Sequence, residues 1–357
     1  MLNKNVELNN KTILVTGSAG FIGSALVKKL LCKIKGSNII GFDNINDYYD
    51  ISLKEYRLEE LKNIKSNCVY RLIKGSIADK ELVFKTFEEY KPEVVVNLAA
   101  QAGVRYSIDH PDIYIESNII GFYNILEACR HYGVEHLVYA SSSSVYGGNA
   151  KVPFDIEDKV DNPVSLYAAT KKSNELLAHS YSKLYNIPST GLRFFTVYGP
   201  AGRPDMAYFS FTNKLIMNQT IEIFNYGDCK RDFTYIDDII EVLIRVMEHA
   251  PIKKVGNDSL PIPPYKIYNV GNSNPENLLD FVKILSEELI NAKVLSEDYN
   301  FETKMKLVPM QPGDVPVTYA DTSMLEADFG FTPHTSLREG LRKFTQWYYE
   351  YFIKEGR

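Results

Sequence analysis

Tryptophan, cysteine and long apolar runs are scarce in this sequence, and each scarcity excludes a class of protein. One Trp stands among 357 residues, although 25 Tyr and 18 Phe are present. The four Cys residues lie far apart, without the close pairs typical of zinc sites, redox motifs or disulfide frameworks. We therefore expect no metal site, and reduced thiols of the kind found in cytoplasmic proteins.

A basic surplus is also missing. Lys and Arg number 40 against 45 Asp and Glu, which gives a net charge of −5, whereas nucleic-acid-binding proteins usually carry excess positive charge. No segment approaches the roughly 18 uninterrupted apolar residues of a membrane span. The first ten residues are polar, unlike a signal peptide. We expect a cytoplasmic protein that binds neither nucleic acid nor membranes.

The first 200 residues alternate apolar runs with helical periods. Strands are predicted at residues 12–16, 38–42, 69–73, 93–98, 136–140 and 189–195, and helices at residues 22–32, 54–64, 80–89, 111–132 and 167–185. Strands that are apolar almost throughout and alternate with helices are typical of a parallel sheet covered on both faces. The pattern predicts an α/β protein with a Rossmann-type, doubly wound parallel sheet.

The length favours two domains at about 150 residues each. Residues 1–200 are predicted to form the Rossmann domain, to which some later segments return. Residues 201–357 are predicted to form mainly a smaller α/β domain that binds the substrate. Within it, residues 251–264 are predicted to be an irregular surface loop, because their prolines interrupt regular structure.

A glycine-rich segment, TGSAGFIG at residues 16–23, joins the first predicted strand to the first predicted helix. Gly17, Gly20 and Gly23 permit a tight turn and let a pyrophosphate approach the backbone at the positive end of the helix. Asp43 ends the next strand, where a carboxylate binds the adenosine ribose and repels a 2′-phosphate. This predicts NAD rather than NADP; the alternative is that the glycines merely close a turn.

Tyr167 and Lys171 lie one helical turn apart at the start of the helix predicted at residues 167–185. A nearby ammonium lowers the pKa of a phenol, which can then act as general base towards a sugar hydroxyl. A serine run at residues 141–144 follows a strand end, where hydroxyls face the ligand side of a parallel sheet. An ordinary surface Tyr–Lys pair beside a serine-rich loop is the alternative.

Together these features resemble the extended short-chain dehydrogenase/reductase family over essentially the whole chain. The family's marks are the glycine loop, NLAAQ at residues 97–101, the serine run, and Tyr167 with Lys171. Within the family the chain looks most like the UDP-glucuronate 4-epimerases. That similarity is carried by FDNINDYYD (42–50) with Leu53 and Lys54, QAGVRYS (101–107), RFFTVYGPAGRP (193–204), KRDFTYIDD (230–238) and MQPGD (310–314).

The resemblance implies a role for each matching residue. It places NAD against Gly17, Gly20, Phe21, Ile22, Gly23, Asp43, Asn44, Ser76, Ile77, Ala99, Ala100, Gln101, Tyr167 and Lys171. Tyr167 is the base, Lys171 its partner, and Ser142 shares the proton of the sugar 4-hydroxyl. Ser143, Ser144, Thr196 and Arg203 fall where these epimerases hold the uronate carboxylate. The UDP part is assigned to Phe224 on uracil, Arg231 on the diphosphate, and Gln311 and Asp314 on phosphate and ribose.

Three positions depart from relatives. Thr196 stands where galactose-type epimerases have Asn, and Gln311 stands where they have Arg, so one positive charge on the diphosphate is lost. Ser76 stands where most relatives place an Asp against the adenine. The first departure argues against UDP-galactose as the main substrate, and the last puts adenine affinity in doubt.

The resemblance also implies the reaction: oxidation at C4 of a UDP-sugar to a 4-keto sugar. Dehydratases then use an acidic pair, and xylose-forming decarboxylases a Glu, where this chain has the neutral Ser143 and Ser144. What is left is C4 epimerisation, from UDP-glucuronate to UDP-galacturonate, with retained NAD. Alternatives are a UDP-hexose or UDP-N-acetylhexosamine 4-epimerase, since Thr318 is small, a dehydrogenase that releases NADH, or a non-catalytic NAD sensor. The family also pairs the helices at residues 111–132 and 167–185 into a homodimer.

Overall fold

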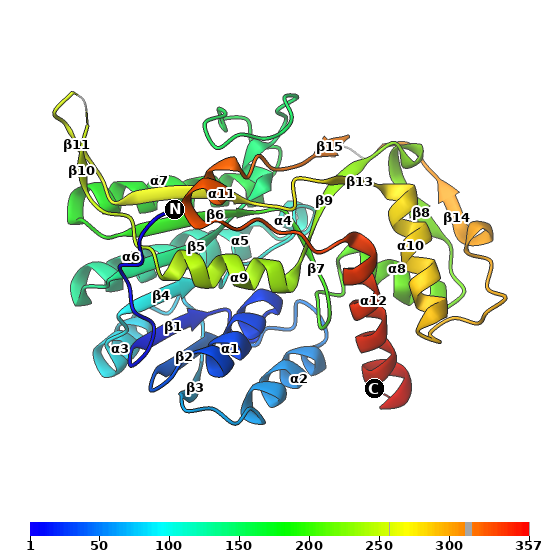
Figure 1. Ribbon diagram of the computed structural model, residues 1–357, viewed down its shortest axis with the longest axis horizontal. Coiled ribbons are helices and arrows are strands. Elements are labelled where there is room, and N and C mark those ends of the chain that lie inside the picture. Colours follow the sequence, from blue (N-terminus) through cyan, green and yellow to red (C-terminus); the bar gives the residue numbers. More distant parts are fainter. Residues whose placement is uncertain (257, 311–315, 357) are drawn as a thin grey trace.

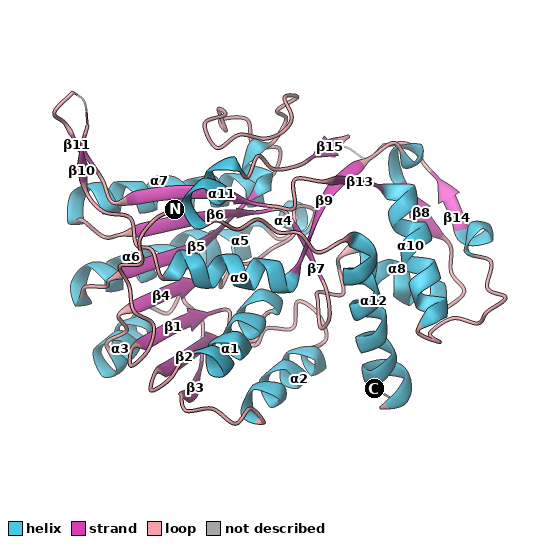
Figure 2. Ribbon diagram, in the orientation of Figure 1, coloured by secondary structure: helices cyan, strands magenta, loops and turns pink. Residues whose placement is uncertain are grey.

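The computed structural model describes residues 1–256, 258–310 and 316–356. At its centre is a seven-stranded sheet in the order β12-β6-β5-β4-β1-β2-β3, with every neighbouring pair parallel (Figures 1 and 2). The strands are β1 Thr12–Thr16, β2 Asn38–Asp43, β3 Val69–Lys74, β4 Val94–Asn97, β5 His136–Ser142, β6 Ser189–Phe194 and β12 Tyr265–Val270. The doubly wound Rossmann-type sheet is confirmed.

Helices cover both faces of this sheet (Figure 1). One face packs against α1 Phe21–Lys33 and α9 Ile236–Met247, with α2 Ile51–Lys62 beside α1, and the other against α3 Lys80–Tyr90, α6 Gly121–Tyr132 and α7 Leu166–Tyr185. The side chains of β1 alternate between two cores: Ile13 and Val15 belong to the first, and Leu14 to the second. The central strands β1 and β4 are buried on both faces, which is why they are apolar almost throughout.

The helix predicted at residues 111–132 is interrupted. It consists of α5 Pro111–Tyr114, a π-helical stretch at Ile115–Ile120 and then α6, preceded by the short α4 Tyr106–Asp109. A π-helical turn carries one extra residue, and such turns often occur at functional sites. Here it places Asn118 against the site described below.

A second region lies beyond the carboxyl ends of the strands, on the right in Figure 1. Its helices are α8 Ala207–Ile216, α10 Leu278–Asn291 and α12 Leu337–Tyr348. Strand β9 Lys230–Tyr235 pairs with β7 Thr196–Tyr198, β13 Pro275–Asn277 and β15 Val317–Thr318, and β8 Ile221–Ile223 pairs with β14 Met305–Leu307. Between these segments the chain returns to the first sheet through α9 and β12, near α11 Ser323–Phe329.

The prediction of an irregular loop at residues 251–264 is wrong. Strands β10 Lys254–Val255 and β11 Pro261–Ile262 form an antiparallel hairpin that projects from the body of the molecule (Figure 1). Pro261 is accommodated because it opens a short edge strand, where a missing N–H group costs no ladder bond. Across the described ranges, no helix is long and apolar enough to cross a membrane.

Candidate active site

The glycine loop follows the carboxyl end of β1, and its glycines pack directly against neighbouring backbone atoms. Gly17 has φ +70°, and a Cβ built on it would lie 2.8 Å from the backbone N of Ala99. A Cβ on Gly23 would lie 2.1 Å from the carbonyl oxygen of Gly17. Phe21 and Ile22 begin α1, whose N-cap Gly20 offers no side-chain cap. The first N–H groups of α1 therefore face the sheet edge, as the binding of a diphosphate requires.

Asp43 ends β2 directly beside this loop. Its Oδ2 accepts a hydrogen bond of 2.9 Å from Ala19 N, and its Oδ1 one of 2.8 Å from Ile45 N. The carboxylate is thus fixed at the position predicted for the ribose contact. The neighbouring Asn44 is exposed and accepts a bond from Asn46 N.

Two further strand ends complete the predicted cofactor side. After β3, Ser76 Oγ accepts from Ala78 N in a turn, and Ile77 is buried. After β4, Ala99 N donates to Thr16 Oγ1, and Ala100 leads to Gln101. The backbone of Gln101 is held by the side chain of Asn118, at 2.8 Å and 3.0 Å.

Gln101 supplies a test of whether the site fits a dinucleotide. Its side chain is buried, and its Nε2 has no hydrogen-bond partner in the part of the chain that the structure describes. A buried donor without a partner is costly and indicates a ligand that satisfies it. With the glycine loop and Asp43, these residues fit NAD.

Tyr167 lies in the first turn of α7, which is capped by Ser165: its Oγ accepts a hydrogen bond of 3.1 Å from Ala168 N. Burial raises its pKa, while a hydrogen bond with Ser142 and the positive charge of Arg203 act in the opposite direction. The phenol therefore lies beside the end of β5, within electrostatic reach of Arg203 in the loop after β7.

Lys171 is placed differently from the simple Tyr–Lys pair expected from the sequence. Its Nζ donates to Ala140 O at 2.9 Å and lies 6.0 Å from the centre of the Tyr167 ring. Burial lowers the pKa of Lys171 to about 8. In this structure the groups that counteract the burial-induced rise in the pKa of Tyr167 are Ser142 and Arg203, rather than Lys171.

The serine run forms a tight turn at the end of β5. Ser142 Oγ accepts from Ser144 N at 3.2 Å and from Ser144 Oγ at 2.9 Å, with Ser143 between them. Thr196, at the start of β7, is partly exposed. The turn contains hydroxyls only, so it offers hydrogen bonds but no acid.

Arg203 follows β7 and is paired within the site. Its Nε and Nη2 donate to Asp205 Oδ1 and Oδ2 at 3.0 Å and 2.5 Å, and Tyr48 OH donates to the same Oδ2 at 3.2 Å. Burial and the charge of Asp205 raise the pKa of Tyr48 to about 12, so this phenol stays protonated. Asp205 engages two of the five guanidinium donors.

Two of the residues assigned to UDP, Phe224 and Arg231, lie in the second region. Phe224 follows β8, and the Arg105 guanidinium lies 5.4 Å from the centre of its ring. Arg231, on β9, donates to the carbonyl oxygens of Lys230 and Pro316. Gln311 and Asp314 lie outside the described residues.

The sequence did not predict a buried network that lies behind the candidate catalytic residues. Arg193 on β6 forms a two-bond ion pair with Glu175 on α7, at 2.8 Å and 2.9 Å. Glu175 also accepts from Ser141 Oγ at 2.7 Å. Glu175 follows Lys171 by one turn and Ser141 precedes Ser142, so the network fixes α7 against β5. The only indication of this network in the sequence is that Glu175 follows Lys171 by one helical turn.

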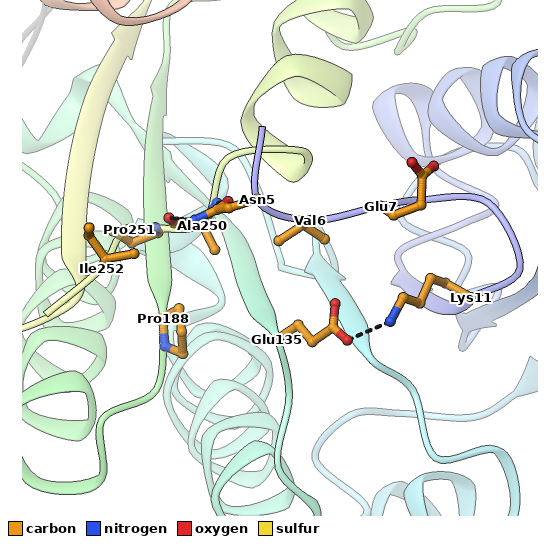
Figure 3. A pocket seen from close by; sticks show the side chains of 9 residues that line it. All are labelled: Asn5, Val6, Glu7, Lys11, Glu135, Pro188, Ala250, Pro251 and Ile252. Atoms are coloured by element: carbon orange, nitrogen blue, oxygen red, sulfur yellow. Dashed lines mark hydrogen bonds and ion pairs between the residues drawn. The ribbon is translucent and has the colours of Figure 1, made fainter. Parts of the chain in front are cut away.

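A surface depression elsewhere has none of this chemistry. It lies among Lys11, Glu135 and Pro188, which precede β1, β5 and β6 (Figure 3). The amino ends of parallel strands are opposite the edge where ligands bind. Lys11 is already paired with Glu135 and Glu93. The candidate site is therefore the carboxyl edge.

Known proteins resemble this chain along nearly its whole length. The model of the NAD dependent epimerase/dehydratase family matches residues 13–271. Protein CapI of Staphylococcus aureus is 50% identical over 348 residues, 96% of this chain and 99% of that protein. UDP-glucuronate 4-epimerase 4 of Arabidopsis thaliana is 44% identical over 351 residues, 96% and 76% of the two chains. The crystal structure of UDP-glucuronic acid 4-epimerase from Bacillus cereus, with UDP-glucuronic acid and NAD, superposes with a TM-score of 0.80 at 31% identity, covering 95% of this chain and 99% of that one.

Proposed function

The chain belongs to the NAD dependent epimerase/dehydratase family, and we propose that within it the protein converts UDP-glucuronate into UDP-galacturonate by inverting C4. The observation that carries the proposal is the meeting of Arg203, Tyr167 and Ser142. The positive charge of Arg203 acts to lower the pKa of Tyr167, so a cation able to pair with a carboxylate lies within electrostatic reach of the base. The Arabidopsis and Bacillus relatives described above support the uronate.

Each residue then has a defined task. Tyr167 removes the proton from the sugar 4-hydroxyl, with Ser142 hydrogen-bonded to both oxygens. Bound NAD supplies the hydride acceptor and donor at C4. The protein holds the cofactor through the glycine loop, Asp43 and the unsatisfied Gln101 amide, and keeps the 4-keto sugar in place while its ring turns. Tyr167 then returns the proton to the inverted hydroxyl.

The serine turn is what favours epimerisation over the family's other outcomes. Elimination of water or assisted loss of CO₂ needs an acid or base beside the keto sugar. Ser143 and Ser144 offer only hydroxyls, which do not titrate near pH 7. With Thr196 and Arg203 they can hold the uronate carboxylate, so that the 4-keto uronate keeps its carboxyl group.

A second candidate is a UDP-N-acetylhexosamine 4-epimerase, because Thr318 on β15 is a small residue at the position where galactose-type enzymes exclude bulky substituents at C2 with a large one. Incubation of the purified protein with a panel of UDP-sugars, followed by chromatographic separation of the epimers, decides between the two. Conversion of UDP-glucuronate at the highest kcat/KM supports the proposal. Preference for UDP-N-acetylglucosamine overturns the uronate assignment.

We expect NAD to co-purify with the protein. The reaction regenerates the cofactor in every turnover, so release gives no advantage, and a bound dinucleotide offers a partner to the buried Gln101 amide. The supernatant of heat-denatured protein is assayed for dinucleotide. Protein that lacks NAD and needs millimolar additions for activity contradicts a retained cofactor.

We also propose a homodimer through α6 and α7. These adjacent helices carry exposed apolar side chains: Leu176 and Leu184 on α7 are 61% and 67% exposed, Tyr123 lies on α6, and Ile120 ends the π-helical stretch just before it. Leu176→Lys combined with Leu184→Lys is expected to convert the dimer into a monomer in sedimentation velocity. Met217→Lys, at an equally exposed apolar residue after α8, is the matched control. A wild-type monomer contradicts the proposal.

A further inference from the structure

Arg57 is a buried arginine that joins the cofactor side of the site to the substrate side. It lies on α2 and is 3% exposed. Its Nη1 donates to Ala19 O in the glycine loop at 3.1 Å and to Tyr49 OH at 2.6 Å. Its Nε and Nη2 donate to Ala201 O at 2.9 Å and 2.8 Å, and Nη2 also donates to Gly202 O at 2.9 Å.

The carbonyls that Arg57 holds belong to an unusual turn immediately before Arg203. Ala201 has φ +52°, the left-handed region that is unfavourable for a residue with a Cβ. A Cβ on Gly202 would lie 1.6 Å from the Tyr208 hydroxyl. Such backbone persists only where its surroundings impose it, and functional sites are common places for it. Arg57 holds this turn through its hydrogen bonds to the carbonyl oxygens of Ala201 and Gly202.

We propose that Arg57 is a positioning residue for the uronate: it fixes the turn at residues 199–203 and thereby aims Arg203. This rests on the proposed function, which gives Arg203 the carboxylate. Asp205 holds the guanidinium of Arg203 from the other side, so backbone and side chain are set by two separate contacts. Because Arg57 also holds the carbonyl oxygen of Ala19, it keeps Arg203 at a fixed position relative to the glycine loop.

The test compares wild type, Arg57→Lys, Ala201→Gly and the double variant. Lysine keeps the charge but loses the planar fork, so it cannot hold Ala201 and Gly202 together. In Arg57→Lys, amide hydrogen exchange at residues 199–206 is expected to become about tenfold faster. The kcat/KM for UDP-glucuronate is expected to fall about 10- to 100-fold, which corresponds to the loss of one or two charge-assisted contacts. UDP-glucose has no carboxylate and loses no charge-assisted contact, so its kcat/KM should fall much less than that for UDP-glucuronate.

Ala201→Gly is the matched variant, because glycine adopts φ +52° without help. In the Arg57→Lys background it is expected to restore several-fold of the lost uronate activity. Unchanged exchange at residues 199–206, equal losses on both sugars, or no restoration by Ala201→Gly each overturn the proposal. If Arg57→Lys does not fold, Gly202→Ala displaces the same turn and must show the same selective loss. A wild type inactive on UDP-glucuronate refutes the proposed function, while the exchange result still shows whether Arg57 holds the turn.

Discussion

Tyr167→Phe is expected to lower kcat for UDP-glucuronate by about 10²- to 10⁴-fold, the range for loss of a general base. The substitution removes one oxygen and keeps the ring, which packs edge-to-face on Tyr114 at 6.1 Å between centroids. The Ser165 cap and the Lys171 bond to Ala140 do not involve the hydroxyl, so the fold and NAD content should be preserved. The loss should appear in kcat, with little change in KM.

The matched control is Tyr114→Phe. Tyr114 lies beside Tyr167, but its hydroxyl donates to the carbonyl oxygens of Ala102 and Gly103, and it has no proton to move in the reaction. It is expected to lose far less activity. If Tyr167→Phe retains activity within twofold of wild type, another group is the base and the proposed mechanism is wrong.

The features predicted from the sequence are those written in local patterns. The strand at Thr12–Thr16 was predicted to the residue, because its apolar run is bounded by Lys11 and Gly17. The order of glycine loop, acid and Tyr-x-x-x-Lys is local too. The direction of Lys171 was not predictable, because its partner is the backbone of another strand.

Other features depend on contacts between segments far apart in the chain. Arg57 reaches Ala201, 144 residues later, and Tyr48 reaches Asp205 over 157 residues. Nothing in the spacing around Arg57 or Asp205 distinguishes them from ordinary surface charges. The π-helical stretch that delivers Asn118 was missed because its extra residue leaves the apolar pattern of residues 111–132 nearly unchanged.

Arg203→Ala separates recognition of the substrate from chemistry. A hydrogen bond to a charged partner contributes about 1.5–3 kcal/mol, so kcat/KM for UDP-glucuronate should fall roughly ten- to a few hundred-fold. Arg203→Lys should rescue only partly, because the ammonium is a point charge and cannot make both bonds to Asp205 and a parallel pair to a carboxylate.

The structure adds a second effect of the same substitution. Burial raises the pKa of Tyr167 and the charge of Arg203 lowers it. Removal of Arg203 therefore raises the pKa of the base. Less phenolate is then present near neutral pH, and both UDP-glucuronate and UDP-glucose lose this share of activity. The shared loss shrinks as the pH is raised, because the base ionises in both proteins.

The measurement is therefore kcat/KM for the two sugars across pH, with wild type, Arg203→Ala and Asp205→Asn. At high pH the loss of kcat/KM shared by both sugars should have shrunk, while the loss specific to UDP-glucuronate should persist. The remaining difference between the two sugars measures the contribution of the contact between Arg203 and the carboxylate. Asp205→Asn keeps Arg203 and serves as the control for loosening of the loop. If UDP-glucose and UDP-glucuronate suffer equal losses at every pH, Arg203 supports the loop or the base alone, and the uronate assignment loses the residue on which it depends.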